Sequence, residues 1–305
     1  MNAGRRQQAA EEAVHLRALV LYWSITGTTR RVAERIADGL RAEGAACDLH
    51  DLRDGVPDDA ASHDIVGVGF PVHWYRPPTP VSQAIAALGR LNGRSVFAFS
   101  LNGSYRGAGL NRARAALVGA GGVELGAFSA YGEDQFYPYA RLGALFSPGH
   151  PTEDELGAAY EFGRQMAATH RGVEQGSQAP APCPPDPPAH PMYALERLVS
   201  GPRLTRVLYS RLFRVDPGRC VRCGICAKGC PVRNISWQRG ELPAWGRDCV
   251  LCLSCVATCP EEAVTCPFDW AVFRPFLRWN VNRAWRDPDL DHARVELKRG
   301  KITRV

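Results

Sequence analysis

The residues best suited to chemistry are eight cysteines that form two copies of one pattern. Each copy reads C-x2-C-x2-C-x3-C-P, and together they hold eight of the 11 cysteines in the chain. Thiolates are soft ligands for iron, and this spacing is one that binds [4Fe–4S] clusters. The pattern therefore predicts two iron–sulfur clusters and one-electron chemistry. The first copy comprises Cys220, Cys223, Cys226 and Cys230, and the second comprises Cys249, Cys252, Cys255 and Cys259.

The fourth cysteine of each copy is expected to bind the cluster of the other copy. Three cysteines spaced two residues apart can wrap a loop around three irons, but the fourth corner needs a ligand from elsewhere. In runs of this type that ligand is the last cysteine of the partner run. The predicted ligand sets are Cys220, Cys223, Cys226 and Cys259 for one cluster, and Cys249, Cys252, Cys255 and Cys230 for the other.

Zinc or free thiols are the alternative interpretation of these cysteines. A single C-x2-C would leave that alternative open, whereas two complete runs that each end in Cys-Pro disfavour it. Three further cysteines lie outside the pattern, and we do not predict them to be ligands. They are Cys47, Cys183 and Cys266.

A second candidate site is the turn between an apolar run at 18–23 and a helical pattern at 30–40. The start of a helix offers free backbone N–H groups and the positive end of the helix dipole, which suit a phosphate. Neither G-x-x-x-x-G-K-[ST] nor G-x-G-x-x-G is present, so a mononucleotide phosphate fits best. A plain N-cap cluster is the alternative. The residues concerned are Ser24, Thr26, Gly27, Thr28 and Thr29.

The elements that must position these residues alternate along the first half of the chain. Apolar runs bounded by turn residues predict strands, and apolar side chains at helical spacing predict helices between them. Thr152 and Glu155 form a capping box before the last helix. Five alternating strands predict a doubly wound parallel α/β sheet. The expected strands are 18–23, 46–52, 64–70, 95–100 and 122–131, and the expected helices are 30–40, 80–88, 107–118 and 152–170.

Composition divides the chain into two domains and a linker. We expect residues 1–170 to form the α/β domain, of which residues 1–16 are a short polar helix or arm, and the proline-rich segment 171–191 to form a stiff linker. Residues 192–305 are expected to form a small α+β domain around the cysteines. One or two basic helices at 192–215 should introduce this domain, and an aromatic and basic tail follows Cys266.

Net charge and hydropathy limit the classes of partner that the chain can be expected to bind. Residues 1–170 have a net charge of −2 and residues 171–305 a net charge of +8, so the cysteine-bearing half could dock onto an acidic redox partner. The absence of long apolar runs and of a secretory leader predicts a cytoplasmic protein whose thiols are free to bind metal. No nucleic-acid motif accompanies the basic residues. The stretch 268–285 mixes aromatics with Arg, and we favour packing over membrane binding for it.

The phosphate-loop pattern resembles that of flavodoxins. S-x-T-G-x-T after the first strand is similar to their FMN phosphate loop, which implies a five-stranded sheet of order 2-1-3-4-5 with FMN at its switch point. The resemblance further implies that the loops after the third and fourth strands hold the isoalloxazine ring. The matching residues are Pro71, Val72, His73, Trp74 and Tyr75 in the first loop, and Leu101, Asn102, Gly103 and Tyr105 in the second.

From about residue 18 to residue 266 the chain resembles a flavodoxin fused to a bacterial-type ferredoxin with two [4Fe–4S] clusters. The resemblance implies an electron-transfer protein that relays single electrons between FMN and the clusters to a redox partner. The alternative is an FMN-dependent oxidoreductase that reduces a small substrate with electrons from the clusters. The segment 133–150 departs from the family pattern and could line a substrate pocket with His73, Tyr75 and Tyr105.

Metal and flavin content give the first test. Anaerobically reconstituted protein is expected to hold about eight iron atoms and one FMN per chain, because two cubane sites and one flavin site are predicted. Iron, zinc and released flavin can be measured on the same sample. Stoichiometric zinc in place of iron, or protein without flavin, would contradict the assignment.

Overall fold

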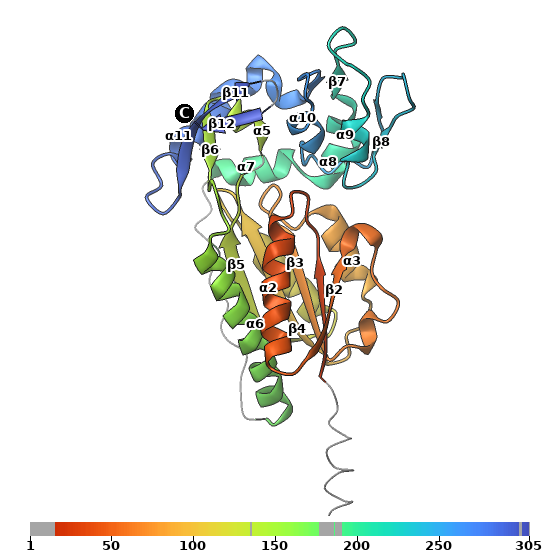
Figure 1. Ribbon diagram of the computed structural model, residues 1–305, viewed down its shortest axis with the longest axis vertical. Helices are drawn as coiled ribbons and strands as arrows, with labels where there is room; N and C mark the ends of the chain where they lie inside the picture. The colour runs from red at the N-terminus through yellow and green to blue at the C-terminus, as the bar shows by residue number, and fades with distance from the viewer. Residues whose placement is uncertain (1–15, 135, 177–185, 187–190, 299–300, 305) are drawn as a thin grey trace, which may run out of the picture.

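A computed structural model describes residues 16–134, 136–176, 186, 191–298 and 301–304 of the chain. Figure 1 shows two halves, a sheet flanked by helices below and the cysteine-bearing half above. The polar arm predicted at the N-terminus and most of the proline-rich linker lie outside the described residues. The helix that precedes the linker continues to Glu174.

A five-stranded parallel sheet forms the lower half, in the order β2-β1-β3-β4-β5. This confirms the predicted doubly wound fold. The inner strands are apolar on both faces because helices cover the sheet from both sides. All eight residues of β4 are buried. The strands are β1 (Arg17–Tyr22), β2 (Ala46–Asp51), β3 (Ile65–Pro71), β4 (Ser95–Asn102) and β5 (Val123–Tyr131).

Two helices pack on each face of the sheet, as the apolar spacing predicts. Val32 and Ile36 on one helix join Phe162 on another in a single buried cluster on one face. Val81 and Leu110 belong to the cluster on the opposite face. The first pair is α2 (Thr28–Ala42) and α6 (Glu153–Glu174), the second is α3 (Thr79–Ala87) and α4 (Gly109–Gly119), and short 3-10 turns lie at Leu52–Asp54 and Ala60–Ser62.

The upper half begins with the two helices expected before the cysteines and continues as short elements. Small two-stranded sheets, β7 with β10 and β8 with β9, frame the cysteine loops. The helices are α7 (Pro191–Val199), α8 (Pro202–Val207), α9 (Ile225–Lys228), α10 (Ser254–Ala257) and α11 (Arg274–Ala284), with 3-10 turns at Tyr209–Arg211, Pro267–Asp269 and Ala271–Phe273. The strands are β7 (Arg214–Val215), β8 (Ile235–Ser236), β9 (Ala244–Trp245), β10 (Val264–Thr265), β11 (His292–Lys298) and β12 (Lys301–Arg304).

The sequence repeat is also a structural repeat. The second copy follows the first at a distance of 29 residues, and α10 repeats α9 at that offset. Left-handed backbone conformations repeat in the same way, because a loop that wraps a small cube of thiolate ligands must reverse direction between its cysteines. The equivalent pairs are Arg222 with Leu251, Gly224 with Leu253, and Arg233 with Glu262.

The segment between β5 and α6 joins the two halves. It forms α5 (Tyr137–Ala140) and β6 (Ala144–Phe146), and β6 pairs with β11 of the C-terminal region in antiparallel fashion. Figure 1 shows β6 in the upper half, away from the sheet that precedes it in sequence. Tyr137 is buried in the same cluster as Leu251 of the cysteine region. The chain thus crosses into the upper half before it returns as α6.

The aromatic tail packs over the cysteine region. Phe268 and Leu277 are buried in the cluster that contains Cys226 and Cys255, although Val272 remains 73% exposed. None of the helices in the described part of the chain is both long and apolar enough to cross a bilayer.

Close contact between α2 and α6 gives a test of the packing. A Cβ atom on Gly163 would lie 2.1 Å from the carbonyl oxygen of Ile36, whereas one on Gly157 of the same helix would meet nothing within 4 Å. We expect Gly163→Ala to lower the free energy of unfolding by about 1–3 kcal/mol, because the two backbones must separate. Gly157→Ala should raise it by up to about 1 kcal/mol, because Ala favours the helix. Urea unfolding followed by circular dichroism measures both, and equal effects would refute the contact.

Candidate functional site

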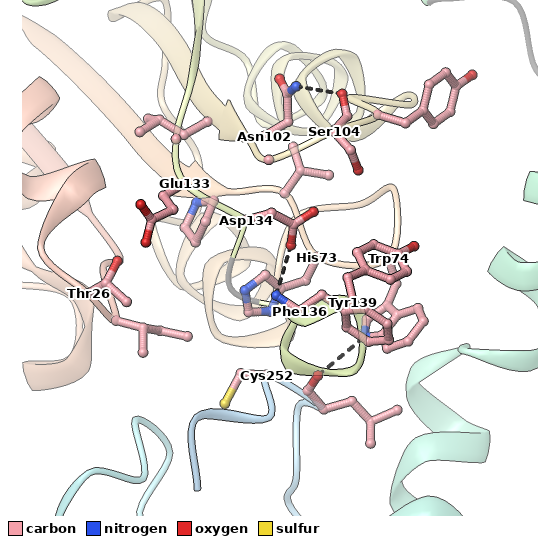
Figure 2. A pocket seen from close by; sticks show the side chains of 18 of the residues that line it. Thr26, His73, Trp74, Asn102, Ser104, Glu133, Asp134, Phe136, Tyr139 and Cys252 are labelled. Carbon is pink, nitrogen blue, oxygen red and sulfur yellow. Dashed lines mark hydrogen bonds between the residues drawn. The ribbon is translucent and has the colours of Figure 1, made fainter. Parts of the chain in front are cut away.

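A cavity of about 500 Å³ lies between the two halves. Its lower wall consists of the loops that follow β1, β3 and β4, where ligands bind in open parallel sheets. Its upper wall comes from the segment after β5, from α7 and α11, and from the second cysteine run. Figure 2 labels side chains from the loops after β1, β3 and β4, from the segment after β5 and from the second cysteine run around one space. The cavity is therefore shared by both halves.

The turn after β1 forms one end of the cavity. Gly27 has φ 91° and precedes the first residue of α2 without a side-chain cap, and the first turn of the helix carries no acidic residue. Thr26, Thr28 and Thr29 line the cavity, and Thr29 Oγ1 has no hydrogen-bond partner among the described residues. Ser24 is buried and accepts the Gly27 N–H at 3.1 Å, so it shapes the turn from below. Such an uncapped helix start suits a phosphate.

The loop after β3 is a tight reversal with an unusual backbone. His73 and Arg76 exchange two backbone hydrogen bonds of 3.0 Å, and Trp74 and Tyr75 between them have φ values of 51° and 62°. Positive φ costs bulky residues about 1–3 kcal/mol each and persists only where contacts impose it. Here the reversal directs both rings toward the upper half.

Trp74 connects this loop to the second cysteine run. Its Nε1 donates to the carbonyl oxygen of Leu251 at 3.4 Å, a contact drawn in Figure 2. Its ring stacks on Phe268 with centroids 5.2 Å apart and meets Phe136 edge-on. Leu251 lies between two cysteines of the run. Trp74 therefore lines the cavity and holds the two halves together.

The other two aromatic residues predicted near a ring also contact the upper half. Tyr105 stacks on Tyr193 of α7 at 4.1 Å between centroids, and Tyr75 packs against both rings. The Tyr75 hydroxyl donates to Glu196 on α7, and burial raises its pKa. Both tyrosines still line the cavity.

The remaining loop residues give the cavity a polar but uncharged lower wall. Burial lowers the pKa of His73 to about 4, so the ring is neutral near pH 7, and its Nδ1 has no partner among the described residues. Pro71, Val72, Leu101, Asn102 and Gly103 line the cavity as well. Asn102 Nδ2 donates to the carbonyl oxygen of Ser104 at 3.2 Å, which stiffens the loop after β4.

Asp134 is a cavity residue from the segment 133–150, which the sequence suggests as a pocket lining without singling out this carboxyl. Asp134 follows β5 and packs closely against Gly103. A Cβ atom added to Gly103 would lie 2.5 Å from the Cβ atom of Asp134. Burial raises the pKa of its carboxyl to about 6, against the opposing effect of the Phe136 N–H, which donates to Oδ1 at 2.8 Å. Figure 2 shows this carboxyl near the centre of the cavity wall.

Glu196 and Asn280 are two further residues that the sequence did not indicate. Asn280 Nδ2 on α11 donates to Glu196 Oε1 at 2.5 Å, and both side chains are buried. Burial raises the pKa of Glu196. Asn280 Oδ1 has no partner among the described residues. Three carboxyl groups and no Lys or Arg side chain are found among the described residues that line the cavity.

The second cysteine run reaches the cavity through Cys252, which lines it together with Leu251 and Ser254. Cys230 lies close enough to this run to act electrostatically on Cys249, Cys252 and Cys255. Burial raises the pKa of Cys249 to about 11 and that of Cys252 to about 12. A buried thiolate is thus costly unless cations such as cluster irons neutralise it.

The first cysteine run surrounds a separate small cavity. Its lining brings Cys259 of the second copy together with the three leading cysteines of the first. Cys223 in this group is exposed to solvent. No three His, Cys, Asp or Glu side chains of the described ranges converge on one metal-ion position. The cysteines that line this small cavity are Cys220, Cys223, Cys226 and Cys259.

Backbone N–H groups point at sulfur in both runs. Asn234 N–H donates to Cys230 Sγ at 3.2 Å, and Ala263 N–H donates to Cys259 Sγ at 3.3 Å, each four residues after its cysteine. Leu251 N–H donates to Cys249 Sγ at 3.4 Å. Such bonds favour the thiolate and tune the potential of a bound cluster.

The cysteines outside the pattern lie elsewhere. Cys47 is buried in the lower half, where burial raises its pKa to about 12. Cys266 is buried at the start of the aromatic tail, and burial raises its pKa to about 12 as well. Neither lines the two cavities described above. Cys183 lies outside the described residues.

Fold and site together define a protein that combines a flavin-binding domain with an iron–sulfur domain. A family described as "Flavodoxin domain" matches residues 19–119, and one described as "4Fe-4S binding domain" matches residues 213–236. The chain thus carries a domain similar to flavodoxins and a region similar to 4Fe–4S binding domains, a pairing that supports electron transfer by flavin and iron–sulfur groups.

Individual relatives are more distant. An "NAD(P)H dehydrogenase (quinone)" from Cupriavidus metallidurans is 28% identical over 182 residues, which are 53% of this chain and 87% of that protein. A flavodoxin from the domain Archaea aligns with a TM-score of 0.42 at 17% identity, over 51% of this chain and 99% of that one. Megasphaera elsdenii flavodoxin aligns with a TM-score of 0.38 at 20% identity, over 50% and 98% respectively.

The raised pKa of Asp134 predicts a pH-dependent stability. In the unfolded chain this carboxyl loses its proton near pH 3.8, and in the folded chain near pH 6. Between these values only the folded state binds the proton, so the free energy of unfolding falls as pH rises, by up to about 3 kcal/mol. Asp134→Asn keeps the acceptor for the Phe136 N–H but carries no charge.

The variant should therefore match the parent in stability near about pH 4 and exceed it above about pH 7. Urea midpoints of flavin-free, cluster-loaded protein measure the difference at both pH values. A difference that does not change with pH would contradict the assignment of the shift to Asp134.

Proposed function

We propose that FMN binds in the cavity between the two halves, with its phosphate at the turn Ser24–Thr29. The uncapped start of α2 supports a phosphate there, because Thr28 and Thr29 offer backbone N–H groups and hydroxyls. His73 Nδ1 and Asn280 Oδ1, which lack partners among the described residues, are available to a polar ring edge. A bound FMN supplies a two-electron carrier that can exchange electrons one at a time.

Two [4Fe–4S] clusters are proposed on the crossed ligand sets. The small cavity lined by Cys220, Cys223, Cys226 and Cys259 supports the first set. The electrostatic contact of Cys230 with the second run supports the other, which adds Cys249, Cys252 and Cys255. Such clusters supply one-electron transfer whose potential depends on burial and on N–H bonds to sulfur. We retain residues 1–170, 171–191 and 192–305 as the proposed flavin domain, linker and cluster domain.

The function supported best is a relay of single electrons between the flavin cavity and the protein surface. The observation that carries it is the position of Cys252, a ligand of the second run that lines the flavin cavity. Cys223 of the first run, in contrast, is exposed. The chain therefore offers one cluster site to the flavin and the other to solvent.

A redox partner is proposed to dock around the first run. Val221 and Ile225 are 62% and 43% exposed beside Cys223, and Arg222 is exposed between them. An apolar patch with basic side chains fits an acidic partner, and the net charge of +8 in residues 171–305 would steer its approach.

Direct reduction of a small substrate at the flavin is a second candidate. The observation that favours it is the polar group formed by Tyr75, Glu196 and Asn280 on the cavity wall. The relative named as a quinone-dependent NAD(P)H dehydrogenase is consistent with an oxidoreductase.

Rapid mixing distinguishes the two candidates. Holoprotein is mixed anaerobically with a reduced one-electron donor protein or with NADPH, and flavin reduction is followed by absorbance. We expect the donor protein to reduce the flavin at least about tenfold faster than NADPH does, and Cys252→Ala and Cys223→Ala each to slow that reduction at least about tenfold, because each removes a cluster ligand. Cys47→Ala, outside both runs, is the matched control.

Iron and FMN content of every variant show whether loss of rate reflects loss of one cluster or of the fold. Flavin reduction by NADPH that is at least as fast as reduction by the donor protein, and that is unchanged in Cys252→Ala, would overturn the relay and support the second candidate.

A further inference from the structure

The segment between β5 and α6 places a carboxyl group at the flavin cavity. This segment lies beyond residues 19–119, over which the flavodoxin family matches, and it supplies Asp134, Phe136 and Tyr139 to the cavity wall. Asp134 is half-buried in the protein, and it is one of the residues that line the cavity. The exposed part of the residue therefore faces the cavity. Its side chain packs against Gly103 in the loop after β4, which is one of the two loops proposed to hold the flavin ring.

The groups around the Asp134 carboxyl leave its charge uncompensated. The N–H of Phe136 donates to Oδ1, and the Ser104 hydroxyl from the loop after β4 also hydrogen-bonds to it. Glu133 on its own segment adds a like charge. Tyr139 on α5 lies close enough for the carboxylate to raise its pKa.

None of these neighbours is a cation. His73 from the loop after β3 lines the same cavity and is neutral because burial lowers its pKa to about 4. No Lys or Arg side chain is present among the described cavity-lining residues. Among the described residues, an ionised Asp134 is therefore stabilised by hydrogen bonds from Phe136 and Ser104 and by no cationic side chain of the cavity lining.

The other two carboxyl groups at the cavity differ in this respect. Glu133 is paired with Arg304 of β12 at 3.7 Å. Glu196 accepts hydrogen bonds from Tyr75 and from Asn280, one on each carboxyl oxygen. Asp134 is thus the carboxyl whose protonation responds most readily to a new charge in the cavity.

We propose that Asp134 takes up one proton when the flavin in this cavity gains an electron. Reduction adds a negative charge beside a carboxyl that burial already makes costly to ionise, and a like charge nearby raises the proton affinity of a carboxylate further. The electron comes from the reduced cluster next to Cys252, which is oxidised by one electron. The proton comes from solvent and forms an O–H bond on the Asp134 carboxyl.

The net charge of the cavity is then unchanged by the transfer. Asp134 holds the proton in the cavity. It is a positioning residue and not a reactant, because no bond between Asp134 and the flavin forms or breaks. The inference rests on the proposed flavin site, and it adds that electron transfer into this site is coupled to pH.

The test is the pH dependence of the flavin midpoint potential. Spectroelectrochemical titration of FMN-loaded, cluster-loaded protein is carried out from about pH 5 to about pH 9, for the parent, Asp134→Asn and Asp58→Asn. Asp58 is exposed in the lower half, so its replacement removes the same charge far from the cavity. A step coupled to one proton shifts a one-electron potential by 59 mV per pH unit, since each pH unit is a tenfold change in proton concentration.

We expect parent and Asp134→Asn to agree at the acid end and to diverge above about pH 6, where the carboxylate forms. In this range the potential of the parent should be the more negative of the two, by up to 59 mV for each pH unit of the coupled window. Asp58→Asn should follow the parent throughout, and Asp134→Glu should restore the divergence from Asn.

Curves for the parent and Asp134→Asn that run parallel at all pH values would overturn the inference, because a structural role moves the potential by a constant amount. That outcome leaves the proposed function standing if FMN and clusters are bound in both proteins. Failure of the parent to bind FMN would instead remove the proposed flavin site, and with it this inference.

Discussion

The structure depends on one constraint, which is that the cysteine-bearing half must stay seated on the open edge of the parallel sheet. Antiparallel pairing of β6 with β11 supplies the backbone part of this attachment. Side chains add to it, among them two from the loop after β3, Trp74 through Leu251 and Tyr75 through Glu196. These contacts account for the positive φ angles of that loop, because only a strong requirement for position holds bulky residues there. Without them the cavity would have no upper wall.

The same attachment determines the electrostatics of the cavity. Burial between two halves removes water from Asp134, Glu196 and Cys252, and it raises the pKa of all three. The carboxyl groups are stabilised by hydrogen bonds from neutral donors instead of by Lys or Arg side chains of the described lining. Such a site favours bound groups that bring positive charge to the thiolates and tolerates little added negative charge without a proton.

Prediction from the sequence succeeded where the determining forces are local. The strands are apolar runs that any doubly wound sheet would bury, and the capping box of Thr152 and Glu155 forms as its spacing indicates. The cysteine repeat predicted its own structural repeat, since equal spacings demand equal loops. The segment 133–150 was predicted as a possible pocket lining, but Asp134 within it was not singled out. Glu196 and Asn280 could not be found in this way, because they meet across a large separation in the chain and belong to no motif. Trp74, Tyr75 and Tyr105 were predicted to surround a flavin ring; they line the cavity, and in addition they bind the upper half.

By itself, the sequence determined the parallel sheet, the phosphate-type turn at Gly27 and the spacing of the eight cysteines, because periodicity, helix starts and short-range ligand geometry are properties of neighbouring residues. Tertiary structure alone decided which cysteine run faces the cavity between the halves, which carboxyl groups share that cavity, and that the segment after β5 belongs to its wall. Those outcomes arise from the docking of one half on the other, and docking depends on shape and burial summed over surfaces that no short stretch of sequence contains.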